Sequence, residues 1–166
     1  MSCRILFVLA LPIVLHSAAS AQPMQSMFQF TDSTDASRWQ IVNDAVMGGR
    51  SSSQAVVVNT QAGEGVLQFT GHLSLENNGG FASVRSRPTE IGLRKGDSIV
   101  ARVRGDGREY TINLYVPRGS GGNSFRQSFK TKKGEWIEVR FSADKFVATW
   151  RGRVFPDQKL DPSKIN

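Results

Sequence analysis

The feature that most constrains this chain is a repeated alternation of apolar and polar residues in short runs. From residue 27 onward the runs are separated by Gly, Asn, Asp and Pro, and helical periodicity is almost absent. Period-two alternation indicates strands with one buried face, and turn residues between the runs mark their connections. The pattern predicts an all-β sandwich or barrel. The predicted strands are 27–31, 38–43, 53–59, 65–75, 81–87, 98–104, 109–116, 124–131, 136–142 and 145–150.

The first 21 residues have the composition of a secretory signal peptide. Arg4 supplies positive charge, residues 5–15 form an apolar run, and Ala19-Ser20-Ala21 is a small-residue cleavage site before Gln22. The apolar run is too short to span a bilayer, and no later stretch is long enough either. We therefore expect cleavage near Ala21 and a mature chain without a transmembrane segment.

The remaining residues, 22–166, are predicted to form a single β-sandwich domain, because no linker or internal repeat divides them. The only cysteine, Cys3, leaves with the signal peptide, so the mature chain has no disulfide. An exported domain without disulfides fits the periplasm of a bacterium better than a disulfide-rich extracellular module. We therefore expect export to the periplasm.

Basic residues are spread through the chain, and the formal net charge is +7. Such a charge favours solubility or attraction to anionic surfaces. Nucleic acid is not the expected partner, because export removes it and no basic helix or stacking motif is present. The expected partner is a protein or a glycan, and the oligomeric state is left open.

Catalytic and metal chemistry find little support in the residue content. The mature chain has a single histidine, His72, and no Asp, Glu or second His lies at ligand spacing from it. Nothing brings two carboxylates together as a glycosidase would need, and most of them lie in turns. A hydrolase using Asp44 or Asp106 is a weak alternative, because the partner group is missing. We expect no catalytic residue, no metal and no cofactor.

The stretch from residue 42 to residue 51, V-N-D-A-V-M-G-G-R-S, combines an amide, a carboxylate and twin glycines. Asn43 and Asp44 are expected to hold a tight connection through side-chain to backbone bonds, and Gly48 and Gly49 to supply positive φ or close backbone approach. The other residues assigned to turns or loops are Asn77, Asn78, Gly79, Gly80, Gly105, Asp106 and Gly107.

A polar face is the main candidate for ligand binding. Gly105-Asp106-Gly107 joins 98–104 to 109–116 and predicts a tight hairpin, which would place the polar sides of both strands on one face. Strand 81–87 has a similar polar side. Such a face suits sugar hydroxyls, carboxylates or an acidic protein surface, although an ordinary solvated face has the same composition. The candidate residues are Arg85, Arg87, Arg102, Arg104, Asn113 and Tyr115.

Several motifs together resemble one protein family, the complex I intermediate-associated protein 30 family. Their order and spacing agree over roughly residues 28–165. The motifs are W-x-x-V-N-D-x-V-M-G-G-x-S from Trp39 to Ser51, F-x-G-x-x-S-L-E-N-N-G-G-F-A-S-V-R from Phe69 to Arg85, R-G-D-G-R-x-Y from Arg104 to Tyr110, F-x-T-K-K-G-E-W from Phe129 to Trp136, and F-V-x-T-W-R-G-R from Phe146 to Arg153.

The resemblance implies a jelly-roll β-sandwich of the galactose-binding-domain-like type, with no catalytic residue and no cofactor. It implies a binding or scaffolding domain, since mitochondrial members assist assembly of NADH:ubiquinone oxidoreductase, and the alternative is an exported carbohydrate-binding module. Export is a departure from the mitochondrial role. The family continues past Leu160–Ile165 with one or two strands, so the resemblance also implies that the last strand or strands are missing, which would leave a sheet edge unpaired.

Overall fold

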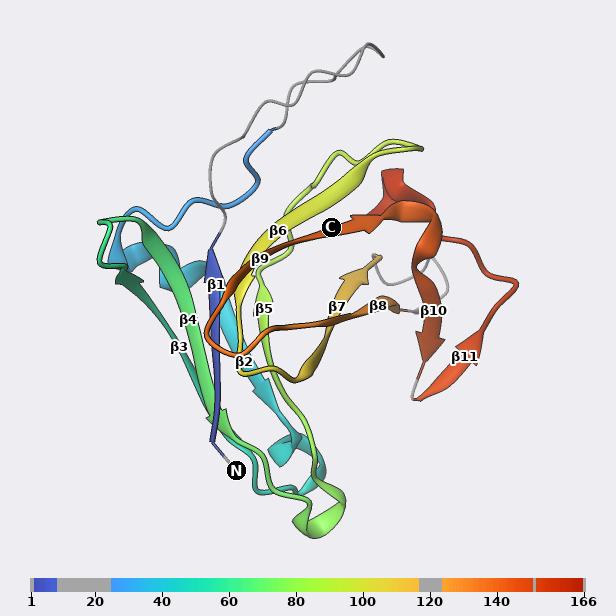
Figure 1. Cartoon of the computed structure of the whole chain (residues 1–166). Helices are drawn as coiled ribbons and strands as arrows, with labels where there is room; N and C mark the ends of the chain where they lie inside the picture. Colours follow the sequence, from blue (N-terminus) through green and yellow to red (C-terminus); the bar gives the residue numbers. More distant parts are fainter. Residues whose placement is uncertain (1, 9–24, 117–123, 151, 166) are drawn as a thin grey trace.

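The computed structural model describes residues 2–8, 25–116, 124–150 and 152–165 and forms two layers of antiparallel strands (Figure 1). One layer is a five-stranded sheet in the order β3-β4-β1-β6-β9. Its strands are β1 (Ser2–Val8), β3 (Ser52–Asn59), β4 (Gly65–His72), β6 (Ser98–Arg104) and β9 (Trp136–Ser142).

The other layer contains a four-stranded sheet in the order β11-β10-β8-β7 and the strand pair β2-β5. The described chain also has five short 3₁₀ helices, four between strands and one after the last strand. The strands are β2 (Trp39–Asn43), β5 (Ala82–Ser86), β7 (Glu109–Tyr115), β8 (Ser124–Lys130), β10 (Val147–Trp150) and β11 (Arg153–Phe155). The 3₁₀ helices are η1 (Ser33–Arg38), η2 (Asp44–Met47), η3 (Glu76–Asn78), η4 (Ala143–Lys145) and η5 (Pro162–Lys164).

The core lies between the two layers. Val103 and Phe141 come from the five-stranded sheet, and Leu114, Phe125 and Phe129 come from the four-stranded sheet. These positions alternate with exposed polar residues along their strands, which is the pattern of a sheet with one buried face. A smaller cluster forms around Phe69 of β4, where β2 and β5 pack on the same sheet.

The prediction of an all-β antiparallel sandwich is confirmed, and every predicted strand from 38–43 to 145–150 is present. The predicted strand 27–31 is wrong: Phe30 of this segment is buried, and Phe28 and Phe30 pack against the ring of Trp39. The jelly-roll, galactose-binding-like form of the sandwich stays a prediction. Residues 2–8 form β1, and cleavage of the signal peptide also stays a prediction.

The predicted hairpin between β6 and β7 is wrong. β6 pairs with β9 and β7 pairs with β8, so the two strands lie in different layers. Between them, Gly105 forms a parallel bridge with Lys133. A Cβ on Gly105 would lie 2.5 Å from Thr131 Oγ1, so glycine is needed for close approach rather than for a two-residue turn. Gly107, with φ 93°, then turns the chain into the other layer.

Candidate functional site

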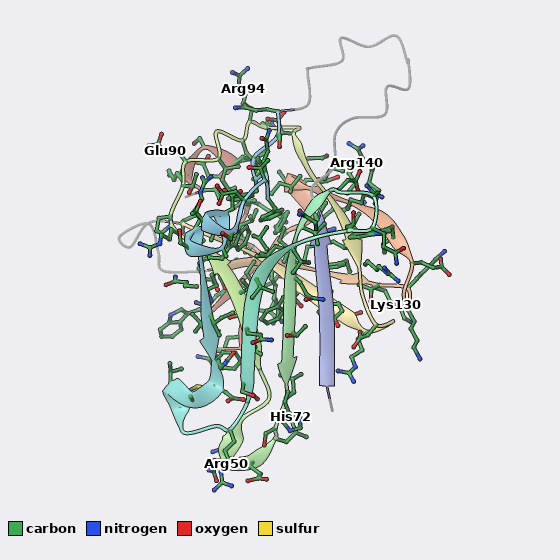
Figure 2. All side chains as sticks on the ribbon, turned by 90° about the vertical axis from the view of Figure 1, so that its left-hand side faces the viewer. Arg50, His72, Glu90, Arg94, Lys130 and Arg140 are labelled. Carbon is green, nitrogen blue, oxygen red and sulfur yellow. The ribbon has the colours of Figure 1, made fainter. Side chains whose placement is uncertain are left out.

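Two loops meet at one end of the sandwich, and we call them together the loop tip, residues 43–51 and 73–81. They carry η2 and η3 at the lower end of Figure 1. In Figure 2 the labelled Arg50 marks this end of the molecule, opposite Arg94. The loops are joined by a 3.0 Å hydrogen bond from the Ser74 N–H to Ser51 Oγ and by an ion pair of 2.9 Å between Arg50 and Glu76.

Asp44 lies at the centre of the loop tip and is fully buried. Its carboxylate accepts hydrogen bonds from the Ser51 N–H at 2.9 Å and from the Ser51 hydroxyl. It also accepts from the Gly80 N–H at 2.6 Å and the Phe81 N–H at 3.2 Å. One carboxylate therefore fastens the β2–β3 loop to the β4–β5 loop, because it satisfies backbone donors from both.

The hydrogen bonds also decide the charge state of Asp44. Burial by itself raises the pKa of this carboxyl, since a charged group is poorly solvated away from water. Donation from the Ser51 hydroxyl and from the N–H groups of Gly80, Ser51 and Phe81 favours the ionised form more strongly and lowers the pKa to about 2. Asp44 is therefore a structural anion at neutral pH, and its oxygens are engaged by donors of its own chain.

The glycines predicted for this region serve two different needs. Gly48 has φ 87°, which a residue with a Cβ rarely adopts. A Cβ on Gly49 would overlap the Asp44 carboxylate, and one on Gly79 would lie 2.8 Å from Asp44 Oδ2. Gly80 has φ 131°. Positive φ and close approach are both confirmed, and the close approach is made to a side chain as well as to backbone.

The predicted asparagines behave differently from one another. Asn77 and Asn78 have φ values of 54° and 59° and form the left-handed turn of η3. Asn43 accepts a hydrogen bond of 2.7 Å from the Ser53 hydroxyl, so the expected bond to backbone is replaced by one to a side chain. The role expected for Asp44 is confirmed, with partners much further along the chain than a local turn requires.

The loop tip exposes three large apolar side chains. Val46 is 75% exposed, Met47 is 60% exposed and Leu75 is 83% exposed. Sequence reasoning missed them because they lie in loops, outside the alternation used to find the sheet faces. The sequence did contain a signal for them. Apolar residues that lie between the Asn, Asp and Gly residues of a loop do not belong to a strand, so they cannot be buried on the inner face of a sheet. All three lie on the two loops that the buried Asp44 carboxylate joins, at one end of the sandwich.

The candidate ligand-binding residues do not form one face. Arg102 and Arg104 lie on the five-stranded sheet, whereas Asn113 and Tyr115 lie on the four-stranded sheet. The structure brings together Arg85 and Tyr115, with the guanidinium carbon 5.3 Å from the ring centroid. The single polar face predicted from a β6–β7 hairpin is therefore wrong, because the two strands belong to opposite layers.

The two arginines of β6 and Arg87, which follows β5, have partners within the chain. Arg102 forms an ion pair of 3.1 Å with Glu64 and lies over the ring of Trp136. Arg104 Nε donates to the Gly134 carbonyl at 2.7 Å. Arg87 Nε donates to the carbonyl of Ser37 at 3.1 Å. The charged groups of these arginines are therefore engaged by residues of the same chain.

A second polar group was missed on the outer side of β7 and β8. Arg126 lies opposite Asn113 in the register of the two strands and is exposed. Thr111 lies opposite Ser128 on the same side, with their hydroxyl oxygens 3.4 Å apart. The alternation of 124–131 was sufficient to find this side, but its pairing partner was not known from the sequence.

The Gly105-Asp106-Gly107 connection links the two layers and is held by side-chain hydrogen bonds. Asp106 Oδ1 accepts from the Tyr110 hydroxyl at 2.7 Å and from the Arg108 N–H at 3.1 Å. The buried Thr131 hydroxyl accepts from the Gly107 N–H and donates to the Arg108 carbonyl. Within the described part of the chain, no group of three His, Cys, Asp or Glu side chains gathers, and no helix is long and apolar enough to cross a membrane.

The fold and the site define an all-β antiparallel sandwich in which a buried carboxylate fastens two loops that display apolar side chains. A family model described as complex I intermediate-associated protein 30 matches residues 28–166. The chain belongs to the complex I intermediate-associated protein 30 family, which confirms the resemblance seen in the motifs. A search of curated proteins finds no match.

Proposed function

We propose that this protein is a non-enzymatic, exported binding domain that acts as an assembly factor for a membrane or redox complex, and that the loop tip is its docking surface. The observation that carries the proposal is the exposure of Val46, Met47 and Leu75 on loops locked by Asp44. Family membership supports the assembly role, since the matching model is described as complex I intermediate-associated protein 30. The galactose-binding-like jelly roll is part of the same proposal.

The physical argument is one of pre-organisation. Full burial of an apolar side chain of this size stabilises a complex by about 1.5–3 kcal/mol. A flexible loop would lose much of that gain in ordering, whereas these loops are already ordered by the hydrogen bonds to Asp44. Three side chains supply the anchor of an interface, and the surrounding Arg50 and Glu76 supply a polar rim.

The proposal is tested with a photo-crosslinking residue at Met47 in the protein expressed in its own organism. We expect a discrete crosslink to a subunit of a membrane complex, identified by mass spectrometry. The matched control places the crosslinker at Val154, which is 50% exposed on β11 and away from the loop tip. The same product at both positions, or none at Met47, would contradict the docking surface.

The assembly role has a separate test. Deletion of the gene should lower the amount of fully assembled NADH:ubiquinone oxidoreductase on native gels, and wild type should restore it. A Leu75→Ser protein should fail to restore it while melting within a few degrees of wild type, because Leu75 is exposed. Normal assembly in the deletion strain would contradict the role, and rescue by Leu75→Ser would remove the loop tip from it.

A carbohydrate-binding module is the second candidate, favoured by the polar outer side of β7 and β8. Tyr115 is 38% exposed and carries Arg85 over its ring, with Asn113 and Arg126 on the same side. An aromatic ring with nearby amide and guanidinium donors suits sugar hydroxyls. Binding to a glycan array that falls at least tenfold in Tyr115→Ala would support this candidate, and the absence of any glycan binding would oppose it.

A further inference from the structure

β1 occupies a central position in the five-stranded sheet. It lies between β4 and β6, which do not pair with one another, and it runs antiparallel to both (Figure 1). Ser2 to Phe7 lie opposite His72 to Leu67 of β4, and Leu6 to Val8 lie opposite Arg104 to Arg102 of β6. The continuity of this layer therefore depends on a segment in its middle.

That segment lies outside the part of the chain that defines the family. The family model begins at residue 28, and β1 falls within the signal peptide expected at residues 1–21. If the leader is cleaved after Ala21, as the proposed export requires, the mature chain loses β1. The rest of the sheet then consists of two separate strand pairs, β3-β4 and β6-β9.

An empty position between β4 and β6 is unfavourable. With strands about 4.8 Å apart, the gap is roughly 10 Å wide, which is the space of one strand. Backbone N–H and C=O groups on both sides would lose their partners. Leu67 and Val103, which are at most 1% exposed and lie opposite β1, would be opened to water. Binding of another strand at this position would therefore be energetically favourable for the mature domain.

The geometry limits what can enter. A strand that is already part of a sheet can pair along one edge only, whereas this position demands pairing on both sides. The occupant must be a free extended segment of about six or seven residues, apolar where it faces Leu67, Phe69 and Val103.

A segment of the same chain, residues 27–31, could compete for the position between β4 and β6, but its contacts hold it elsewhere. Residues 27–31 have the alternation of a strand, but the rings of Phe28 and Phe30 lie 4.9 Å and 5.9 Å from the ring of Trp39. Phe30 is buried, and its carbonyl lies against Gly65 at the start of β4. These contacts keep residues 27–31 outside the position between β4 and β6.

We propose that the position between β4 and β6 is a strand-accepting site, which binds a free, extended apolar segment of another polypeptide once the leader has been removed. The inference rests on the proposed export and assembly role, and it assigns the occupant to an unassembled partner subunit. β1 shows the geometry of the bound segment. Main-chain hydrogen bonds to two strands supply affinity, and the bordering apolar residues supply selectivity for apolar sequences.

The test uses the full chain with a specific protease site inserted after Met24, cut only after folding. The probe is a labelled peptide of residues 2–8, Ser-Cys-Arg-Ile-Leu-Phe-Val, with Cys3→Ser to prevent disulfides. We expect saturable one-to-one uptake of the peptide by the cut protein, measured by fluorescence anisotropy in mild denaturant that lets the cut strand exchange. The uncut protein should take up at least tenfold less.

The control peptide carries Leu6→Pro, because Leu6 pairs with both Gln68 and Arg104 and proline has no N–H to donate. It should bind at least tenfold more weakly. Equal binding of both peptides, or no uptake by a cut protein that keeps its circular dichroism spectrum, would overturn the proposal. So would hydrogen exchange showing that residues 27–31 become protected as β4 and β6 close on them.

One measurement separates this inference from the proposed loop-tip docking, and a second tests the cleavage on which it rests. The Leu75→Ser protein, cut in the same way, should take up the peptide like wild type, so failure of the loop tip leaves this result unchanged. N-terminal sequencing of the protein isolated from cells should find a chain beginning near Gln22. A chain that keeps residues 2–8 would fill the site with its own strand and overturn the proposal.

Discussion

Two aspartates in glycine-rich connections, Asp44 and Asp106, have very different roles in this molecule. Asp44 is fully buried and binds backbone donors as far away as Phe81. The Asp106 side chain is 22% exposed and accepts from Arg108 and Tyr110, two and four residues further on. At the second connection, the long-range tie is made by the neutral hydroxyl of Thr131. The contact made by the charged Asp44 therefore depends on pH, whereas the contact made by the neutral Thr131 hydroxyl does not.

The largest expected effect is that of Asp44→Asn. The amide keeps the shape but replaces one carboxylate oxygen by an NH₂ group, so either the Ser51 N–H at Oδ1 or the N–H groups of Gly80 and Phe81 at Oδ2 lose their acceptor. We expect the melting temperature to fall on the order of 10 °C. Differential scanning calorimetry checks this, and a fall no larger than that of Asp106→Asn would erase the distinction between the two connections.

Substitutions at the adjacent residues Gly48 and Gly49, close to Asp44, distinguish steric from conformational effects on stability. Gly48→Ala meets no atom within 4 Å and adds only the strain of φ 87°, so a loss of about 1 kcal/mol is expected. Gly49→Ala drives a methyl into the Asp44 carboxylate, which its hydrogen bonds hold in place, so a loss of about 2–3 kcal/mol is expected. Urea unfolding measures both, and the reverse order would show that Asp44 is free to move.

Low pH should weaken the hydrogen bonds to Asp44, because these bonds favour its ionised form. The pKa of Asp44 is about 2 in the folded chain and about 3.9 in the unfolded chain. A lowered folded pKa gives stability that is present above the unfolded value and is lost as pH falls toward the folded one. The difference in melting temperature between wild type and Asp44→Asn should therefore shrink from pH 5 to pH 2. A constant difference would mean that the charge of Asp44 contributes nothing.

The smallest expected effect is that of Asp106→Asn. The amide oxygen can still accept from Tyr110 and Arg108, and only the 3.4 Å ion pair with Arg108 is lost. An exposed or half-exposed ion pair contributes about 1 kcal/mol or less. The free energy of unfolding, measured by chemical denaturation, should therefore fall by at most that amount, and the fall should be smaller in high salt. A larger loss would make Asp106 a second structural anion.

Much of the fold follows from local pattern. Alternation identifies the strands from β2 to β10 and gives the buried side of each, as in Leu114 and Phe125. It does not give pairing, because a strand with one apolar side can lie in either layer. The Gly105 connection shows the limit: a glycine that permits a tight hairpin also permits close packing against Thr131 on the way to the other layer.

The candidate site shows the same limit. Asn, Asp and Gly at residues 43–51 and 77–80 mark irregular backbone, and the sequence is sufficient to predict turns there. That Asp44 bonds Gly80 across 36 residues, and that Leu75 is left exposed beside it, depends on two loops meeting at one end of the sandwich. The polar residues Arg102 and Tyr115 are separated for the same reason, since their strands belong to opposite layers.

The sequence by itself determined that this chain is all-β, where most strands begin and end, and the family to which it belongs, because strand periodicity, turn chemistry and motif spacing are local properties. Only the tertiary structure decided which aspartate is a buried lock, which apolar residues remain exposed, and which strand lies between β4 and β6. Those outcomes depend on contacts between segments far apart in the chain. The free energy of such a contact is set by burial and by the pairing of polar groups in space, which no local pattern records.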